Sequence, residues 1–130
     1  MTNKGSRLLI LGSASAYPPK ADSLTNEEVE LNMNIPRVQS EEHLRETYGA
    51  ILVRLAGIYG PGRHVLNWIR RGKIKNTDRY VNFIHVKDIA SLCIEALRKS
   101  KPGSTYIASD GTPRHWSDIC QFSDTEWNIP

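Results

Sequence analysis

The segment richest in glycine could bind a phosphate. Gly57, Gly60 and Gly62 lie close together, and glycine-rich turns can present backbone N–H groups to a pyrophosphate. Their spacing is the reverse of the G-x-G-x-x-G pattern of dinucleotide-binding turns, which the sequence does not contain. Pro61 between them has no N–H. We therefore interpret the segment as a poor phosphate cradle and as a turn that lets the backbone approach another group closely.

Metal-ligand and nucleophile patterns are missing from the sequence. The four histidines form no i, i+4 pair and have no cysteine partner at metal-ligand spacing. Ser13 follows Gly12 but lacks the second glycine of a G-x-S-x-G nucleophile elbow. We expect neither a metal site nor an elbow of this kind.

Positive charge is concentrated in one stretch. Residues 51–75 contain no acid and six bases: Arg54, Arg63, Arg70, Arg71, Lys73 and Lys75. Such a stretch could contact an anionic ligand or a nucleic acid. For Arg70, Arg71 and Lys73 we favour a solvated helix end, where cations complement the helix dipole. Since the three tryptophans are scattered along the sequence, a base-stacking platform is not expected, and nucleic acid is an unlikely partner.

Alternating strands and helices must position these residues. Apolar and β-branched runs predict strands over residues 8–11, 50–56, 80–86 and 105–108. The first two runs are continuous, as in strands buried on both faces. Amphipathic patterns predict helices over residues 36–48, 64–71 and 86–97 and from Pro113, with Gly49 as the carboxyl cap of the first helix. In that helix Val38, Leu44 and Thr47 would form the apolar stripe, and residues 57–62 would be the turn after the second strand.

This order predicts a parallel α/β sheet with helices on both faces, because parallel strands need a crossover connection. A chain of 130 residues with 39% hydrophobic and 24% charged residues is typical of one globular domain. No apolar run reaches the ~18 residues of a membrane span, and residues 8–11 are too short for a secretory leader. With Cys93 and Cys120 read as small hydrophobes in a reducing compartment, we expect a cytoplasmic protein without membrane association.

Three segments resemble a known family. Residues 54–63 are RLAGIYGPGR, residues 83–90 are FIHVKDIA, and residues 9–17 are similar to a strand that ends in Ser-Ser-x-x-Val-Tyr-Gly. In this order they resemble the carboxyl-terminal half of the extended short-chain dehydrogenase/reductases, the NAD-dependent epimerase/dehydratases. The resemblance implies the carboxyl-terminal part of a Rossmann-like doubly wound parallel sheet, NAD or NADP as cofactor and a small-molecule substrate. Residues 1–130 would be a single partial domain that lacks the phosphate-binding half.

The resemblance also implies roles near the start of the chain. Ser13 matches the Ser/Thr that hydrogen-bonds the reacting oxygen of the substrate, although its hydroxyl could instead satisfy the end of its strand. Ser15 and Tyr17 match a hydroxyl and an aromatic that border the substrate, and packing alone would equally explain Tyr17.

Further matches lie in the glycine-rich segment. Gly57, Tyr59, Gly60 and Pro61 match residues beside the nicotinamide, and Gly62 and Arg63 match the substrate side. Gly57 stands where many sugar-nucleotide epimerases have an asparagine, which weighs against a sugar-nucleotide substrate. His85 and Asp88 are expected to be structural, at a strand end and in a first helical turn.

The proton donor of the family is missing. That donor is the tyrosine of a Tyr-x-x-x-Lys pair, whose lysine lowers the phenol pKa. Arg37 stands at the tyrosine position and Glu41 at the lysine position. Arginine does not readily release a proton, and a carboxylate would raise a phenol pKa. Tyr59 and Arg63 share the four-residue spacing, but we expect them in a loop and interpret the pair as coincidence.

Two functions therefore stay open from the sequence. The chain could be part of an NAD(P)-dependent epimerase/dehydratase-like oxidoreductase and be inactive in isolation. Alternatively, it could belong to a non-catalytic dinucleotide- or partner-binding module that has lost the tyrosine and the lysine.

Overall fold

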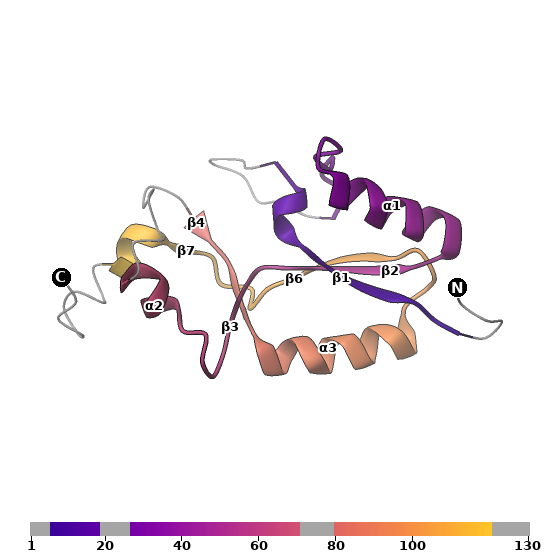
Figure 1. Cartoon of the computed structure of the whole chain (residues 1–130). Coiled ribbons are helices and arrows are strands. Elements are labelled where there is room, and N and C mark those ends of the chain that lie inside the picture. Colours follow the sequence, from indigo (N-terminus) through magenta and orange to yellow (C-terminus); the bar gives the residue numbers. More distant parts are fainter. Residues whose placement is uncertain (1–5, 19–26, 71–79, 121–130) are drawn as a thin grey trace.

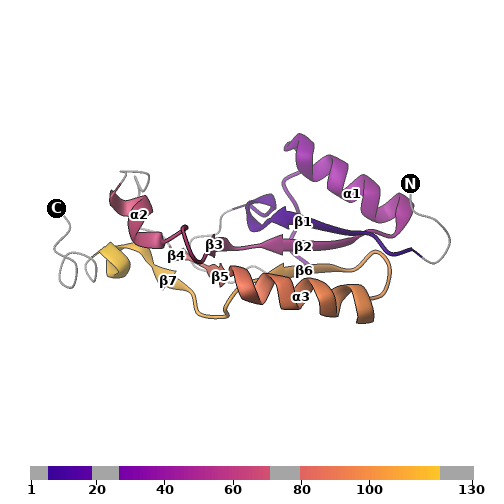
Figure 2. The ribbon, with the colours of Figure 1, turned by 60° about the horizontal axis from the view of Figure 1, so that its bottom comes forward.

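A three-stranded parallel sheet forms the centre of the protein. The computed structural model describes residues 6–18, 27–70 and 80–120. The strand order is β1-β2-β6, where β1 is Leu9–Ser13, β2 is Ile51–Leu55 and β6 is Thr105–Ala108. The helix α1 (Pro36–Tyr48) connects β1 to β2, and α3 (Val86–Lys99) precedes β6. The two helices cover opposite faces of the sheet (Figures 1 and 2). The predicted α/β fold is confirmed.

The central strand β2 is buried along its whole length. Ile51, Val53 and Leu55 belong to the same apolar cluster as Ile89 and Ala96 of α3. Because side chains alternate across a strand, Leu52 and Arg54 project to the other face, which α1 covers. A charged side chain in the middle of β2 therefore requires polar partners on α1.

The first strand is less buried than its sequence predicts. Leu9 pairs with Ile51 and Ser13 with Leu55 in a parallel ladder. Within the described residues β1 has β2 as its only strand neighbour, and 49% of Leu11 is exposed. The prediction of a strand buried on both faces is therefore wrong for β1, since helix and strand contacts cover only part of its surface.

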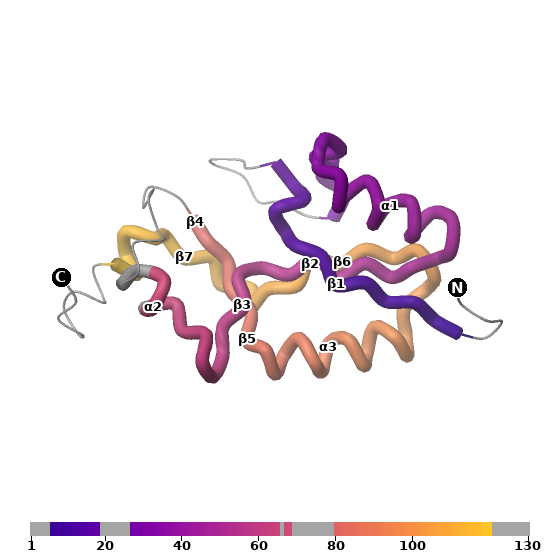
Figure 3. The backbone as a smooth tube through the Cα atoms, viewed as in Figure 1, coloured from indigo at the N-terminus to yellow at the C-terminus, as the bar shows by residue number. Residues whose placement is uncertain are grey.

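The segment after β2 continues as a strand. Only Ala56 separates β2 from β3 (Gly57–Tyr59), which pairs in parallel with β5 (Phe83–His85). Figure 3 shows the backbone running from β2 into β3. The predicted turn at 57–62 is thus wrong for its first half. The reversal lies at residues 60–63, where the backbones of Gly60 and Arg63 hydrogen-bond to each other in both directions.

Other predicted boundaries also differ. The predicted strand over 80–86 is two short strands separated by Asn82, β4 (Tyr80–Val81) and β5. β4 pairs antiparallel with β7 (Arg114–His115), so the predicted helix from Pro113 begins only at residue 116. The short helix α2 (Val65–Arg70) lies within its predicted range. Arg71, Lys73 and Lys75 lie outside the described residues.

Both long helices begin and end at residues that suit these positions. Pro36 opens α1, and Gly49 ends it in the left-handed conformation with φ 71°. At the start of α3, the Lys87 N–H donates to His85 Nδ1 at 3.1 Å, and Asp88 lies in the first turn. His85 is therefore a helix cap in this structure.

The aromatic residues gather around Phe83. Its ring lies 6.3 Å from Tyr59, 6.1 Å from Trp68 and 5.7 Å from Trp116, between ring centroids. Two tryptophans that are far apart in the sequence, Trp68 and Trp116, therefore pack against the same phenylalanine. Since Trp116 is only 2% exposed, this cluster packs the core and does not form an open stacking platform.

Within the described ranges, no helix is long and apolar enough to cross a bilayer. The same residues contain no group of three or more histidine, cysteine or acidic side chains that could hold a metal ion.

Candidate functional site

Two serines mark the carboxyl end of β1. Ser13 ends the strand, and the 3-10 turn η1 (Ala14–Ala16) follows at once. The Ser15 N–H donates to Ser13 Oγ at 3.1 Å, and the two hydroxyl oxygens are 2.8 Å apart. The turn thus brings both hydroxyl groups together at the carboxyl end of β1. In doubly wound sheets this end of the strands is where ligands bind.

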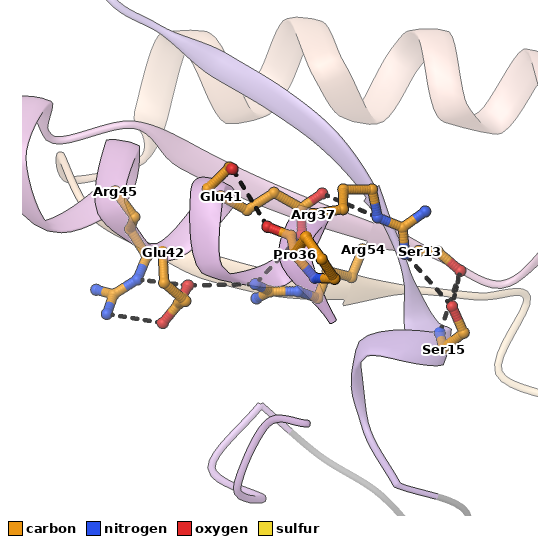
Figure 4. A network of polar contacts seen from close by, with 9 residues as sticks. Ser13, Ser15, Pro36, Arg37, Glu41, Glu42, Arg45 and Arg54 are labelled. Carbon is orange, nitrogen blue, oxygen red and sulfur yellow. Dashed lines mark hydrogen bonds and ion pairs between the residues drawn. The ribbon is translucent and has the colours of Figure 1, made fainter. Parts of the chain in front are cut away.

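The helix α1 brings a guanidinium to the serines. Arg37 is the second residue of α1, and its Nη2 lies 3.5 Å from Ser15 Oγ. Its Nε lies 3.7 Å from Glu41 Oε2, one helical turn further along. Figure 4 shows Arg37 between Glu41 and the serine pair. The side chain of Arg37 is 52% exposed, so its position is defined while solvent still reaches it.

Glu41 is buried, in contrast to Arg37. Only 4% of Glu41 is exposed. It lies on the face of α1 for which the sequence predicts an apolar stripe of Val38, Leu44 and Thr47. Val38 is buried as predicted, but Leu44 is half-buried and Thr47 is exposed. A side chain at Gly12 would place its Cβ 2.7 Å from Glu41 Oε2. Glycine at that position therefore leaves room for the carboxylate next to β1.

Arg54 is the buried partner of the α1 carboxylates. Its side chain is 0% exposed, and its Nη2 lies 3.2 Å from Glu42 Oε2 and 3.7 Å from Glu41 Oε1. Arg45 donates to both carboxylate oxygens of Glu42 at 3.0 and 3.1 Å. The sequence analysis counted Arg54 among the six bases of residues 51–75 and did not assign it a partner. A lone arginine in an apolar strand sequence was the available sign of a buried ion pair.

The pKa of Glu42 reflects this setting. Burial alone would raise the pKa of Glu42, but the hydrogen bonds from Arg45 and Arg54 outweigh burial and lower it. Glu42 is therefore a carboxylate at neutral pH, and it neutralises part of the charge of the two guanidinium groups.

Tyr17 lies on the buried side of this network. It is 6% exposed, and the guanidinium carbon of Arg54 lies 5.7 Å from its ring centroid. Burial raises the pKa of Tyr17, against the opposing effect of Arg54. In this network the buried atoms without a well-formed hydrogen bond to the described residues include the Tyr17 hydroxyl, Glu41 Oε1, and Nε and Nη1 of Arg54. Tyr17 is therefore a buried, protonated phenol at neutral pH.

The glycines of β3 and of the turn after it pack against β5 and α3. A Cβ at Gly57 would lie 3.1 Å from Phe83 Cδ1, and one at Gly60 would lie 2.7 Å from Val86 Cγ1. The Gly57 N–H donates to Asn82 O at 2.9 Å, and the Gly60 N–H donates to Arg63 O at 3.1 Å. The close backbone approach predicted for this segment is thus to β5 and α3.

Because the N–H groups of Gly57 and Gly60 are already bonded, they are not available to bind the pyrophosphate of a dinucleotide. The cofactor-binding roles of Gly57, Tyr59, Gly60 and Pro61 stay predictions, as do the substrate-side roles of Gly62 and Arg63.

Tyr59 and Arg63 contact different neighbours. The Tyr59 ring meets the His85 ring edge-on, with 5.1 Å between centroids. Arg63 Nε donates to Ile58 O at 2.9 Å, and the guanidinium carbon lies 5.5 Å from the Trp68 ring centroid. Their four-residue spacing therefore does not bring a phenol and a cation together on one helix face.

A shallow hollow lies at the opposite end of the sheet. Arg7, Leu8, Tyr48 and Pro102 are among its lining residues, near the amino ends of β1 and β2. Its position is not the ligand-binding end of a doubly wound sheet. We therefore take the serines and Arg37 as the candidate site.

The structure of the chain is similar to structures with NAD or NADPH bound. No family model matches the chain, and no curated protein matches it in sequence. A functionally unknown protein from Silicibacter pomeroyi matches with TM-score 0.75 and 24% identity, over 94% of this chain and 46% of that one. The dTDP-glucose 4,6-dehydratase of Bacillus anthracis, in complex with NAD, matches with TM-score 0.74 and 18% identity, over 95% of this chain and 47% of that one.

A third match is RMD from Pseudomonas aeruginosa in complex with NADPH, with TM-score 0.72 and 17% identity, over 94% of this chain and 50% of that one. The chain thus spans about half the length of the structures it matches. At these identities the comparisons establish the fold, and the Rossmann-like fold implied by the family resemblance is confirmed.

Proposed function

We propose that the chain forms the substrate side of a cytoplasmic, NAD(P)-dependent epimerase/dehydratase-like protein and does not oxidise or reduce nicotinamide by itself. Residues 1–130 would be one partial domain, the downstream half of the Rossmann-like fold. The matched structures support this, because the chain covers 46–50% of them and two of them hold NAD or NADPH. The substrate would be a small molecule bound at the carboxyl end of β1.

The observation that carries the proposal is the guanidinium beside the serine pair. Arg37 Nη2 lies 3.5 Å from Ser15 Oγ, which supports the match of position 37 to the family tyrosine. A guanidinium keeps its protons at any ordinary pH and cannot serve as the acid. In this arrangement Ser13 and Ser15 would orient the substrate by hydrogen bonds, and Arg37 would supply a fixed positive charge.

A non-catalytic binding module is the second candidate. The buried Glu41 favours it, because position 41 here stabilises the fold and does not tune a phenol. Such a module would bind a dinucleotide or a partner and leave it unchanged.

The experiment is a turnover and binding assay on purified 1–130 protein. NADH and NADPH are incubated with a panel of aldehydes and ketones, and nicotinamide absorbance is followed against a heat-denatured sample. We expect no turnover by the wild type or by the Arg37→Tyr/Glu41→Lys variant, because the dinucleotide phosphates lack a binding turn in this chain. Nicotinamide oxidation by folded wild-type protein would refute the proposal. Saturable NADH fluorescence without turnover would favour the binding module.

A further inference from the structure

The serine pair and Arg37 leave hydrogen-bond donors unused. The two hydroxyls are 2.8 Å apart, so they share one hydrogen and keep the other for an outside acceptor. Arg37 meets Ser15 only at 3.5 Å and Glu41 only at 3.7 Å, both long for a charged hydrogen bond. Within the described residues, Arg37 Nη1 makes no hydrogen bond. The guanidinium of Arg37 and the hydroxyl groups of Ser13 and Ser15 thus offer hydrogen-bond donors close together at a half-exposed site.

The buried residues Glu41 and Arg54 support the cluster of Ser13, Ser15 and Arg37. Glu41 is shared between Arg37, at Oε2, and Arg54, at Oε1. Arg54 is fully buried and fixes the carboxylate, while Gly12 leaves it room beside β1. Because Glu41 divides its charge between two guanidinium groups, the positive charge of Arg37 is only partly neutralised.

From these observations we infer that Ser13, Ser15 and Arg37 bind a carboxylate group of the substrate. A guanidinium and a carboxylate match as planar partners with two parallel hydrogen bonds. The charge selects a monoanion, because a second negative charge would face the Glu41 carboxylate next to Arg37. The inference deepens the proposed function and rests on it for taking this end of the sheet as the substrate side.

The test is an NMR titration of the 1–130 protein with sodium acetate at constant ionic strength. We expect saturable shifts of the Ser15 backbone amide and the Arg37 Nε–H signal. Arg37→Gln should weaken acetate binding about tenfold or more, the loss typical of a charged hydrogen bond. The matched control is Arg98→Gln, since Arg98 is 69% exposed on α3 and pairs with Glu95 at 3.7 Å, across the sheet from α1. This variant should bind acetate like the wild type.

Two further measurements separate a specific site from general attraction. Glu41→Gln should tighten acetate binding about twofold to fivefold, because it removes a competing carboxylate from Arg37. Inorganic phosphate at pH 7.5 should bind more weakly than acetate.

Unsaturable shifts, equal acetate binding by wild type and Arg37→Gln, or phosphate binding as tight as acetate binding would each overturn the inference. None of these readouts involves nicotinamide, so acetate binding and the turnover assay can fail separately.

Discussion

Replacing Arg54 with methionine should destabilise the chain strongly. The side chain of Arg54 is fully buried, and its Nη2 lies 3.2 Å from Glu42 and 3.7 Å from Glu41. Removing one partner of a buried ion pair costs about 3–5 kcal/mol, because the remaining charge is left buried without compensation. Single domains are stable by about 5–15 kcal/mol, so Arg54→Met should remove a large part of the free energy of unfolding.

Tryptophan fluorescence in a urea titration at pH 7 measures this loss. Arg98→Met is the control, and because its ion pair is exposed it should change the unfolding free energy by less than about 1 kcal/mol. In Arg54→Met, Glu42 keeps Arg45, and Glu41 keeps only the half-exposed Arg37 at 3.7 Å. An unfolding free energy within about 1 kcal/mol of the wild type would refute the reasoning.

Two further predictions concern acid stability and the β3 turn. The folded-state pKa of Glu42 is lowered, so its contribution is complete above the ordinary glutamate pKa of about 4.3 and is lost as pH falls through the lowered value. In urea titrations between pH 7 and pH 2, Glu42→Gln should show a shallower acid loss of stability than the wild type, and an unchanged slope would contradict this. Gly60→Ala should cost about 1–3 kcal/mol in the same assay, because its Cβ would lie 2.7 Å from Val86 Cγ1. Gly62→Ala is its matched comparison, because the φ of +78° at Gly62 strains the backbone of an alanine while its Cβ would have no atom within 4 Å. A Gly60→Ala variant as stable as the wild type would exclude the steric argument.

The long elements could be predicted because their sequence patterns are local. The helix over 36–48 has a proline at its start and a glycine at its end, and it was found with the same bounds. The strand β3 could not be predicted, because its three residues begin with glycine and are followed by more turn residues. What makes residues 57–59 a strand is pairing with β5, which is distant in the sequence. Such pairing overrides local propensity.

The candidate site was predictable in part. The family resemblance pointed to Ser13, Ser15 and the position of Arg37, and the structure brings these three together, although their roles stay predictions. The partnership of Arg54 with Glu41 and Glu42 could not be predicted. It depends on which face of β2 meets α1, and that is set by strand alternation and helix packing in three dimensions.

The two positions that match the tyrosine and the lysine of the resembled family differ in their surroundings. Glu41 is 4% exposed and belongs to the buried charge network, where it compensates Arg54. The side chain of Arg37 is 52% exposed and meets the serines over a long contact. The absence of a phenol at position 37 is therefore compatible with the inferred site, in which the fixed charge of Arg37 binds a carboxylate group.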